Sequence, residues 1–356
     1  MNLDLSETQA LLQETLRGYL ERELPFDRVR ELEREQRWDE ALWKEVCSQG
    51  WLSLPFAEEH GGGGGSLVDA GILLEEFARR AALVPVLEVL AAGRALQQHG
   101  GGELLPAMLE GSVVAVPSML ESSDANAEPV LRVEAGVLSG EKAFVDYGQF
   151  ATHHLVSARD ADSVGLFLVE VGAAVSCQAL RSIGRTPLCR VRYESAPARR
   201  VAGPEAVAGL VRVGRALASV QCVGSMQQAL DMTVAYAKVR EQFGKPIGSF
   251  QAVRHHCANM AMRVASSRLL AYEALSALDA GSASDAQVAV AKASASRAAP
   301  EVTLLAHQIH GGNGMIEEND LYFFTLRAKE YSLAWGSAEE CLAVVAGGVD
   351  SPTEWL

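Results

Sequence analysis

Cysteine is scarce and scattered in this sequence. The 356 residues include six cysteines, and none of them forms a C-x-x-C pair or a Cys/His spacing that could hold zinc. We therefore expect free, buried thiols in a reducing compartment, and we predict no metal site.

Positive charge is also in short supply. The chain has 31 Lys and Arg residues against 45 Asp and Glu residues, which gives a net charge of -14 and a pI near 5.1. No cluster of basic residues interrupts this excess of negative charge. Phosphate backbones and anionic lipids are repelled by such a chain, so nucleic acid and membrane surfaces are not expected as partners.

Long hydrophobic runs are absent too. No apolar stretch reaches the ~18 residues that are needed to cross a bilayer. The N-terminal sequence MNLDLSETQALLQETLRGYL has acidic residues and helical spacing in place of a basic stretch followed by an apolar core. We expect neither a membrane span nor a signal peptide, and hence a cytoplasmic location.

Helical periodicity dominates the first part of the chain. Apolar residues recur at three- and four-residue spacing, for example at Leu12, Leu16 and Leu20, and predict an N-terminal helical domain over residues 1–111. The five glycines Gly61–Gly65 interrupt it. They fit either a flexible linker or a tight loop between packed helices, and the helices predicted close on both sides favour the loop.

The residue pattern changes after residue 111. Residues 112–203 contain short runs rich in β-branched residues, such as PVLRVEAGVLSGEKAFVD and SVGLFLVEV, which predict antiparallel strands in a small barrel or sandwich. Helical spacing returns over residues 204–356. The predicted fold class is α+β, mainly α, with helices, then strands, then helices.

Two segments of the last part carry side chains suited to a dinucleotide. Arg240 offers a fixed charge and a fork of donors for a pyrophosphate, and Phe243 offers a flat face for a ring. Gln251 and Gln308 offer amide hydrogen bonds, and the pair Gly311-Gly312 lets backbone N–H groups approach an anion. Each feature alone is usually a cap or a turn, but together they predict a dinucleotide clamp.

These segments resemble the acyl-CoA dehydrogenase family. The resemblance rests on R-x-x-F-G-x-x-I-x-x-F-Q over Arg240–Gln251 and on Q-x-x-G-G-x-G over Gln308–Gly314, with PFAEEHGGGG and LRAK as further similar stretches. It implies a helical domain, a β domain and a C-terminal four-helix bundle. It also implies FAD as the cofactor, an acyl-CoA thioester as the substrate, and electron-transfer flavoprotein as the electron acceptor.

The family resemblance further assigns roles to residues. In the family the clamp reaches across a subunit interface and holds the ADP part of an FAD whose flavin ring belongs to the neighbouring subunit. The cofactor-binding residues that it implies here are Arg240, Gln242, Phe243, Gln251, Gln308, Gly311, Gly312 and Ser337.

The catalytic base of the family is missing from both places where it is found. In most members it is a Glu shortly after the helix that carries the R-D-A-K stretch, and here Trp335 has that position. In other members it lies on the long helix, where this chain has Gly214. An indole and a glycine cannot accept the proton. Arg215 matches an Arg near the acyl-CoA channel, and it is either a retained contact or a surface charge.

Three carboxylates remain as possible substitutes for the base. Glu339 and Glu340 come one helical turn after Trp335, and a solvated helix face is the favoured interpretation for both. Asp146 stands in Phe144-Val145-Asp146, where the family has a W-I-T or W-I-S strand, and it would approach from the flavin side. The family's T-E-P-x-x-G-S-D loop has likewise become Met119–Asp124.

The intact clamp and the missing base together suggest one role. The chain is predicted to be the base-lacking subunit of an α2β2 acyl-CoA dehydrogenase, which would act in lipid metabolism on fatty acid or steroid side chains. Such heteromeric enzymes are known from actinobacteria, and the Ala, Arg and Gly content fits a bacterium. The alternatives are an active homomeric dehydrogenase with an unusual base, and a flavin-free scaffold protein on this fold.

Overall fold

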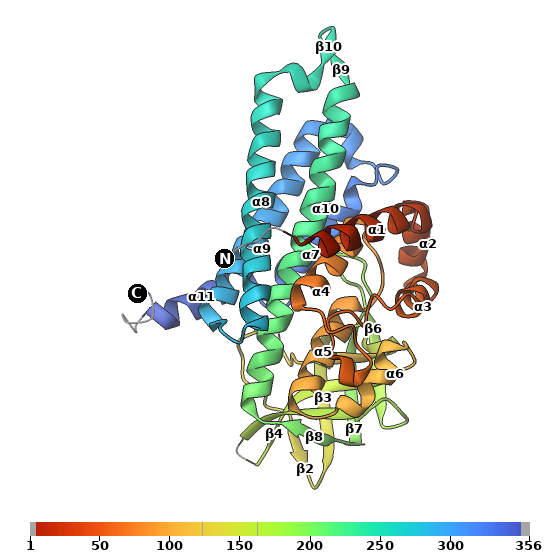
Figure 1. The fold of residues 1–356 in the computed structure, drawn as a ribbon, viewed down its shortest axis with the longest axis vertical. Coiled ribbons are helices and arrows are strands. Elements are labelled where there is room, and N and C mark those ends of the chain that lie inside the picture. The colour runs from red at the N-terminus through yellow and green to blue at the C-terminus, as the bar shows by residue number, and fades with distance from the viewer. Residues whose placement is uncertain (1–4, 123, 162, 350–356) are drawn as a thin grey trace. The chain divides into compact units, whose positions relative to one another are not determined.

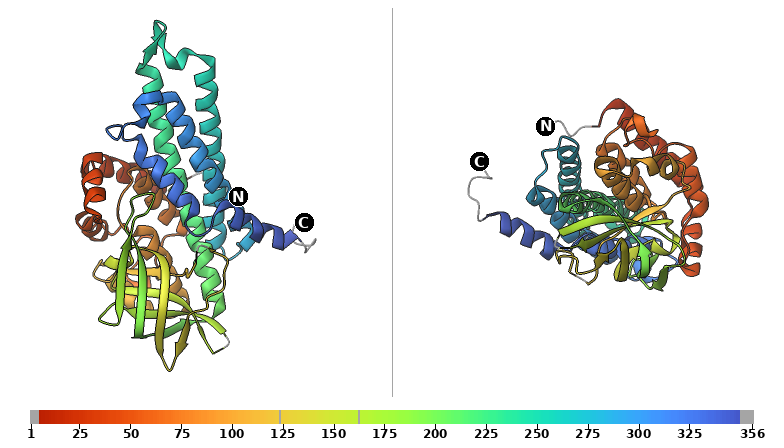
Figure 2. Two further views of the ribbon diagram at one scale, coloured as in Figure 1. Left: turned by 180° about the vertical axis from the view of Figure 1, so that it is seen from behind. Right: turned by 90° about the horizontal axis from the view of Figure 1, so that it is seen from below.

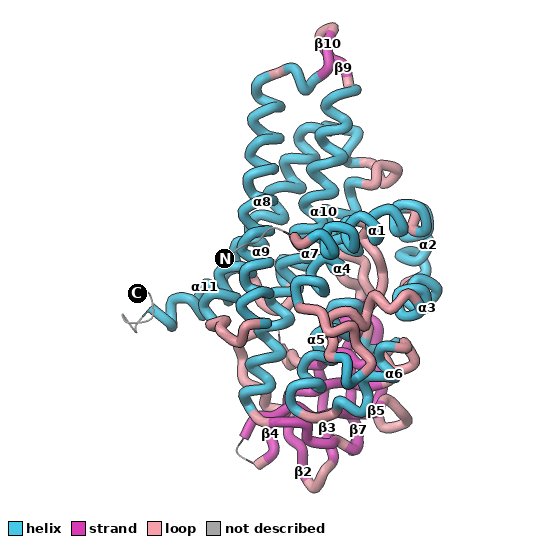
Figure 3. The backbone as a smooth tube through the Cα atoms, viewed as in Figure 1, coloured by secondary structure: helices cyan, strands magenta, loops and turns pink. Residues whose placement is uncertain are grey.

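The computed structural model describes residues 5–122, 124–161 and 163–349 (Figure 1). The chain forms two compact units. The first, called the bundle unit, comprises residues 1–30, 71–82 and 215–356, and the second, called the sheet unit, comprises residues 31–70 and 83–214. Along the chain, the strands of one large sheet come after one group of helices and before another, as the sequence predicts. Figure 3 colours the helices cyan and the strands magenta.

The bundle unit is built on long helices. Its helices are α1 (Glu7–Glu23), part of α2 (Phe26–Glu35), most of α4 (Leu67–Arg79), the larger part of α7 (Pro204–Val239), α8 (Gln251–Asp279), α9 (Asp285–His310), α10 (Leu321–Leu333) and α11 (Ala338–Val349). A hairpin of β9 (Glu241–Gln242) and β10 (Lys245–Pro246) joins α7 to α8, and Figure 2 shows it at the end of this helix pair.

Helix α7 is long and apolar enough to cross a membrane, with a mean hydropathy of 1.3 in its most apolar window. No such segment is expected from the sequence. However, 67% of that window is buried inside the protein. This burial is typical of the core helix of a folded domain, because a lipid-facing helix would expose its apolar surface.

The sheet unit contains one eight-stranded sheet in the order β6-β7-β3-β2-β4-β5-β8, with β1 paired to β4. Most pairs are antiparallel, as predicted, but β1 and β2 both pair with β4 in parallel. The strands are β1 (Ala115–Ser118), β2 (Arg132–Glu134), β3 (Val137–Asp146), β4 (His153–Asp160), β5 (Ser163–Glu170), β6 (Val175–Leu180), β7 (Leu188–Pro197) and β8 (Arg199–Ala202).

Helices accompany the sheet in the same unit. They are α3 (Glu40–Ser48), α5 (Val86–His99) and α6 (Leu105–Leu109), with short 3-10 turns η1 (Glu58–His60), η2 (Gly102–Leu104) and η3 (Gly148–Phe150). Helix α5 is buried almost all round and contacts β1, so it serves as the core helix of this unit.

The glycine run Gly61–Gly65 folds back on the chain before it. The backbone N–H groups of Gly63, Gly64 and Gly65 donate to the carbonyls of Ser53, Phe56 and Leu54. A Cβ atom at Gly62 would lie 2.1 Å from the Phe56 carbonyl oxygen, so no other residue fits there. The run is therefore a tight loop, and the alternative of a flexible linker is wrong.

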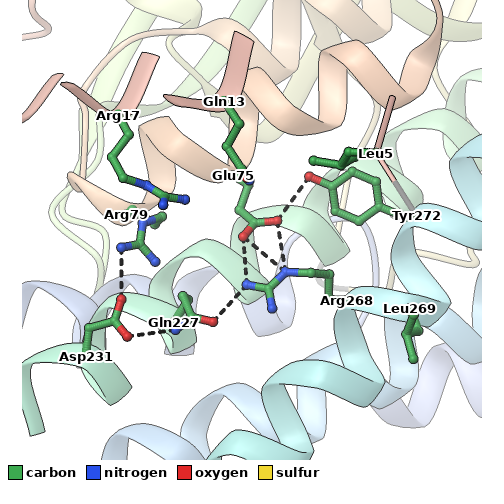
Figure 4. Close-up of a pocket in the computed structure, with 10 residues that line it drawn as sticks. All are labelled: Leu5, Gln13, Arg17, Glu75, Arg79, Gln227, Asp231, Arg268, Leu269 and Tyr272. Atoms are coloured by element: carbon green, nitrogen blue, oxygen red, sulfur yellow. Dashed lines mark hydrogen bonds and ion pairs between the residues drawn. The ribbon is translucent and has the colours of Figure 1, made fainter. Parts of the chain in front are cut away.

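Two consecutive buried carboxylates organise the bundle unit. Glu75 of α4 accepts hydrogen bonds from Arg268 and Tyr272 of α8, at 2.8 Å and 3.0 Å (Figure 4). Its neighbour Glu76 accepts from Arg17 of α1 at 2.6 Å. Arg79 extends the network from α4 to Asp231 of α7. The network borders a polar cavity of about 480 Å³ and ties four helices together.

We expect Glu75→Ala to destabilise the bundle unit strongly. The substitution leaves the Arg268 guanidinium and the Tyr272 hydroxyl without their buried acceptor, and breaking such a pair costs about 3–5 kcal/mol. The measurement is the apparent melting temperature. Glu301→Ala is the matched control, because Glu301 pairs with Arg263 on the exposed surface and should cost no more than about 1 kcal/mol. Equal shifts for the two variants would contradict the role given to Glu75.

A second buried polar group lies inside the sheet unit. The His154 ring is fully buried, with Nε2 3.1 Å from the Gly148 carbonyl and Nδ1 3.0 Å from the Tyr193 hydroxyl. Burial in a nonaqueous environment penalises the charged form of this ring. Burial lowers the pKa of His154 to about 4.

We expect His154 to make the stability pH-dependent. Its pKa is lower in the folded than in the unfolded chain, so unfolding takes up a proton below pH 6.5, and stability falls as the pH drops from about 6.5 to about 4. The total loss is about 3 kcal/mol. His154→Gln cannot titrate and should show a flatter stability profile over this range in urea unfolding. An unchanged slope would contradict this assignment.

Candidate functional site

The predicted clamp begins at the end of α7, in the bundle unit. Arg240 follows the helix directly, and its backbone N–H still donates to the Tyr236 carbonyl. The Arg240 carbonyl then accepts from Ile247 at 2.8 Å, which closes the hairpin. The hairpin is thus anchored at its base by backbone hydrogen bonds.

The tip of this hairpin presents an aromatic ring to solvent. Phe243 and Gly244 both have left-handed backbone angles, with φ values of 53° and 76°. This pair of positive φ angles is typical of the tight turns that connect two-residue hairpins. The Phe243 ring is 91% exposed and contacts Phe250 edge-on at 6.0 Å. Such exposure of a large ring costs stability unless something outside this chain covers it.

A ring stack brings the second segment to the same end of the bundle. Tyr236 of α7 stacks on His310 of α9 with ring centroids 4.4 Å apart. Gln308 lies in the last turn of α9 and is exposed. Gly311 follows the helix with a φ of 61° and a ψ of -141°, a conformation that favours glycine. The space around Gly311 and Gly312 is open.

The side chains of the clamp have donors available. Arg240, Gln251 and Gln308 are exposed, and within residues 5–122, 124–161 and 163–349 their side chains have no hydrogen bond or ion pair. Gln242 differs, because its amide nitrogen donates to the Glu241 carbonyl at 2.8 Å. A free guanidinium, two free amides and an open glycine turn at one end of a helix bundle fit a dinucleotide.

The corner between α10 and α11 contains Trp335, the position at which the family resemblance predicts a base. Trp335 lies there in the left-handed region with a φ of 60°, and Gly336 follows with a φ of 111°. The Trp335 carbonyl accepts a hydrogen bond from Arg215 Nε at 3.0 Å. Arg215 is buried, so the interpretation as a surface charge is wrong. Gly214, beside it on α7, is also buried.

A buried ammonium holds the same corner from α9. Lys292 Nζ donates to the carbonyls of Tyr331 and Ser332, at 3.0 Å and 3.3 Å, and to Ser296 Oγ at 2.6 Å. These carbonyls belong to the last turn of α10, where the helix supplies no further N–H groups that could donate to them. Burial lowers the pKa of Lys292. The carbonyls at the end of α10 also carry partial negative charge, which a cation there offsets.

Ser337 is the N-cap residue of α11. Its Oγ accepts from the backbone N–H of Glu340 at 3.2 Å, and its own N–H donates to the Glu340 carboxylate at 2.6 Å. This reciprocal pair is a capping box. It engages the Glu340 carboxylate in helix capping, and Glu339 is exposed to solvent. The Glu340 carboxylate therefore serves as a capping group at the start of α11.

The residues Phe144–Asp146, which resemble the family's flavin-facing strand, form the end of β3. Phe144 has a φ of 54°, within an irregularity of the pairing between β3 and β7. In the loop after β1, the carboxylate of Glu121 accepts from Lys142 Nζ at 2.7 Å and from the backbone N–H groups of Val130 and Leu131. The loop is thus tied to the sheet by a carboxylate. Ser123 of this loop lies outside the described residues.

Sequence reasoning did not single out Lys142, Lys292 or His310. Each is a polar residue in a stretch that periodicity assigns to a strand or a helix, and in the structure each is buried at a place that fixes a loop or a corner. The only signal was a charged or polar residue on an otherwise apolar face. In the described part of the chain no cluster of His, Cys, Asp or Glu could hold a metal.

Comparison with known proteins identifies the family. The profile "Acyl-CoA dehydrogenase, N-terminal domain" matches residues 6–111, and "Acyl-CoA dehydrogenase, C-terminal domain" matches residues 202–349. This chain belongs to the acyl-CoA dehydrogenase family. The resemblance seen in the sequence and the predicted fold class are both confirmed.

Relatives of this acyl-CoA dehydrogenase family member match over nearly their whole length. Acyl-CoA dehydrogenase IpdE2 of Mycolicibacterium smegmatis is 30% identical, over 95% of this chain and 97% of the relative. A solved structure of the Tcur3481-Tcur3483 steroid ACAD is 30% identical with a TM-score of 0.92, over 97% and 98% of the two chains. The ChsE4-ChsE5 complex from Mycobacterium tuberculosis is 27% identical with a TM-score of 0.92, over 99% of both.

Ser337 can be tested for its two possible roles. We expect Ser337→Ala to lower stability by about 1 kcal/mol because the cap of α11 is lost. Ser337→Asp keeps a capping oxygen and should unfold like the native chain. If the hydroxyl also binds a cofactor, Ser337→Asp will lose bound flavin from the assembled protein while its melting temperature is unchanged. A Ser337→Ala variant as stable as the native chain would contradict the capping role.

Proposed function

We propose that this chain is the base-lacking subunit of an FAD-dependent acyl-CoA dehydrogenase of α2β2 composition. In this assembly a homologous subunit with an intact Glu supplies the base, and this chain lends its clamp to the FAD of that partner. The observation that carries the proposal is the corner at Trp335, where the backbone is held by Arg215 and the side chain at the predicted base position is an indole. The same chain presents free clamp side chains.

The clamp residues support binding of the ADP part of FAD. Arg240 would pair with the pyrophosphate, the Phe243 ring would cover a flat face, and Gln251 and Gln308 would donate to polar groups of the nucleotide. Gly311 and Gly312 leave space for a close approach. FAD when bound supplies the hydride acceptor for α,β-dehydrogenation. The residues of this chain contribute binding and orientation only.

Exposed apolar side chains on the bundle unit support a partner subunit. Single exposed apolar residues are ordinary, but several on neighbouring helices mark an interaction surface. They come from α8, α9, η5 (Gly311–Met315), the turn that follows and α10, and they are Met262, Leu269, Leu304, Met315, Ile316 and Leu333. A homologous subunit packed against these helices would cover them.

The names of similar proteins support the substrate class. Two of the similar structures are heteromeric by name, and one of them is a steroid ACAD. We therefore propose a bulky, steroid-like acyl-CoA thioester as the substrate of the assembly. Electron-transfer flavoprotein is the proposed acceptor of the electrons, and a cytoplasmic location is proposed. Arg215, buried against the Trp335 corner, remains a proposed substrate contact.

Flavin content separates this proposal from its rivals. We expect the isolated chain to carry little FAD and to show no acyl-CoA oxidation. Co-expression with a homologue that has the Glu, sought among the neighbouring genes, should give a complex with flavin and turnover. Stoichiometric FAD and rapid turnover in the isolated chain would favour the active homomer. In that case Asp146→Asn, Glu339→Gln and Glu340→Gln should identify the base. A complex without flavin absorbance would favour the scaffold protein.

The role of the clamp in trans has its own test. Arg240→Gln removes the charge that would face the pyrophosphate, and loss of such a charge-assisted hydrogen bond should weaken FAD binding by the co-purified complex about tenfold or more. Arg263→Gln is the matched control, because Arg263 lies on the exposed face of α8 and pairs with Glu301. Equal FAD affinity in both complexes would rule out the clamp.

A further inference from the structure

A separate cavity of about 310 Å³ lies within the sheet unit. Its walls come from the end of α2, from η3 and from the connection between β6 and β7. None of the clamp residues or corner residues borders it. The polar residues that line it include Glu33, Arg34, Gln149, Arg181, Arg185 and Thr186.

The lining carries more positive than negative charge. Three arginines border the cavity and only one carboxylate does. Arg185 Nη1 lies 3.5 Å from Oε2 of the buried Glu33 carboxylate. Across the described ranges, the guanidiniums of Arg34 and Arg181 have no carboxylate or hydrogen-bond partner. Two guanidiniums therefore have donors available at the wall of one cavity, in a chain whose net charge is -14.

The side chain of Gln149 also borders the cavity. Its amide oxygen is buried and is not exposed to the cavity. The donors available at the cavity wall are therefore those of the guanidiniums, which call for an anionic ligand.

We propose that this cavity binds a phosphate group. Phosphate oxygens match the fork of donors of a guanidinium, and Arg34, Arg181 and Arg185 come from two separate segments that meet here. Metal cations are disfavoured by the excess of arginine. The site is distinct from the clamp and does not depend on the proposed function.

The phosphate can come from free phosphate or from the 3′-phosphate of CoA. Titration calorimetry of the full-length protein with inorganic phosphate tests the shared chemistry. Titrations with CoA and with dephospho-CoA distinguish the sources, because the two differ only in that phosphate. If CoA binds more tightly than dephospho-CoA, and Arg181→Gln removes this difference, the site binds the 3′-phosphate of CoA. Equal binding of the two, with saturable binding of inorganic phosphate, assigns it to free phosphate.

The variants isolate the cavity. We expect Arg34→Gln and Arg181→Gln each to weaken phosphate binding about tenfold, the loss of one charge-assisted hydrogen bond. Gln149→Glu should abolish binding, because it places a carboxylate against the anion. Arg190→Gln is the matched control, since Arg190 is an exposed arginine of β7 outside the cavity. Arg34 and Arg181 are exposed, so their substitution should not affect folding. Unchanged melting temperatures will show that the variants fold.

Two results would overturn the proposal. The first is phosphate binding that does not saturate in the native protein. The second is saturable binding that Arg34→Gln, Arg181→Gln and Arg190→Gln leave equally tight. The readout does not involve flavin, so this site can fail while the proposed subunit role stands, and the reverse also holds.

Discussion

The bundle unit depends on the burial of two adjacent carboxylates, Glu75 and Glu76. Burying an ionised carboxylate is costly unless charged or hydrogen-bonding partners surround it. Here those partners come from other helices, with Arg17 from α1 and Arg268 and Tyr272 from α8. The requirement to satisfy both carboxylates fixes which faces of these helices meet. Close approach of α4 and α7 adds to this constraint, because a Cβ atom at Gly224 would lie 2.4 Å from the Glu75 carbonyl oxygen.

The corner at Trp335 is held through its backbone. Arg215 and Lys292 donate hydrogen bonds to the backbone carbonyls of Trp335, Tyr331 and Ser332. Carbonyl groups are common to all residues. These contacts therefore do not depend on which side chain stands at position 335.

The sheet unit shows the same use of polar groups as internal ties. Lys142 is buried and joins the loop after β1 to β4 through Glu121, Met119 and Ser157. The buried ring of His154 links β4 to η3. Periodicity cannot find such residues, because a lysine or histidine in a strand pattern normally indicates the solvent face. Only the tertiary structure shows that these two point inward.

The sequence by itself determined the order of helices and strands and the family. Local periodicity determines the order of elements, and short motifs such as Arg240–Gln251 indicate the family. The tertiary structure decided which side chains are engaged and which are free. It engaged Ser337 and Glu340 in a cap, buried Arg215, folded Gly61–Gly65 into a tight loop, and left Arg240, Gln251 and Gln308 exposed. Burial and hydrogen bonding between residues distant in sequence depend on packing, which no local pattern encodes.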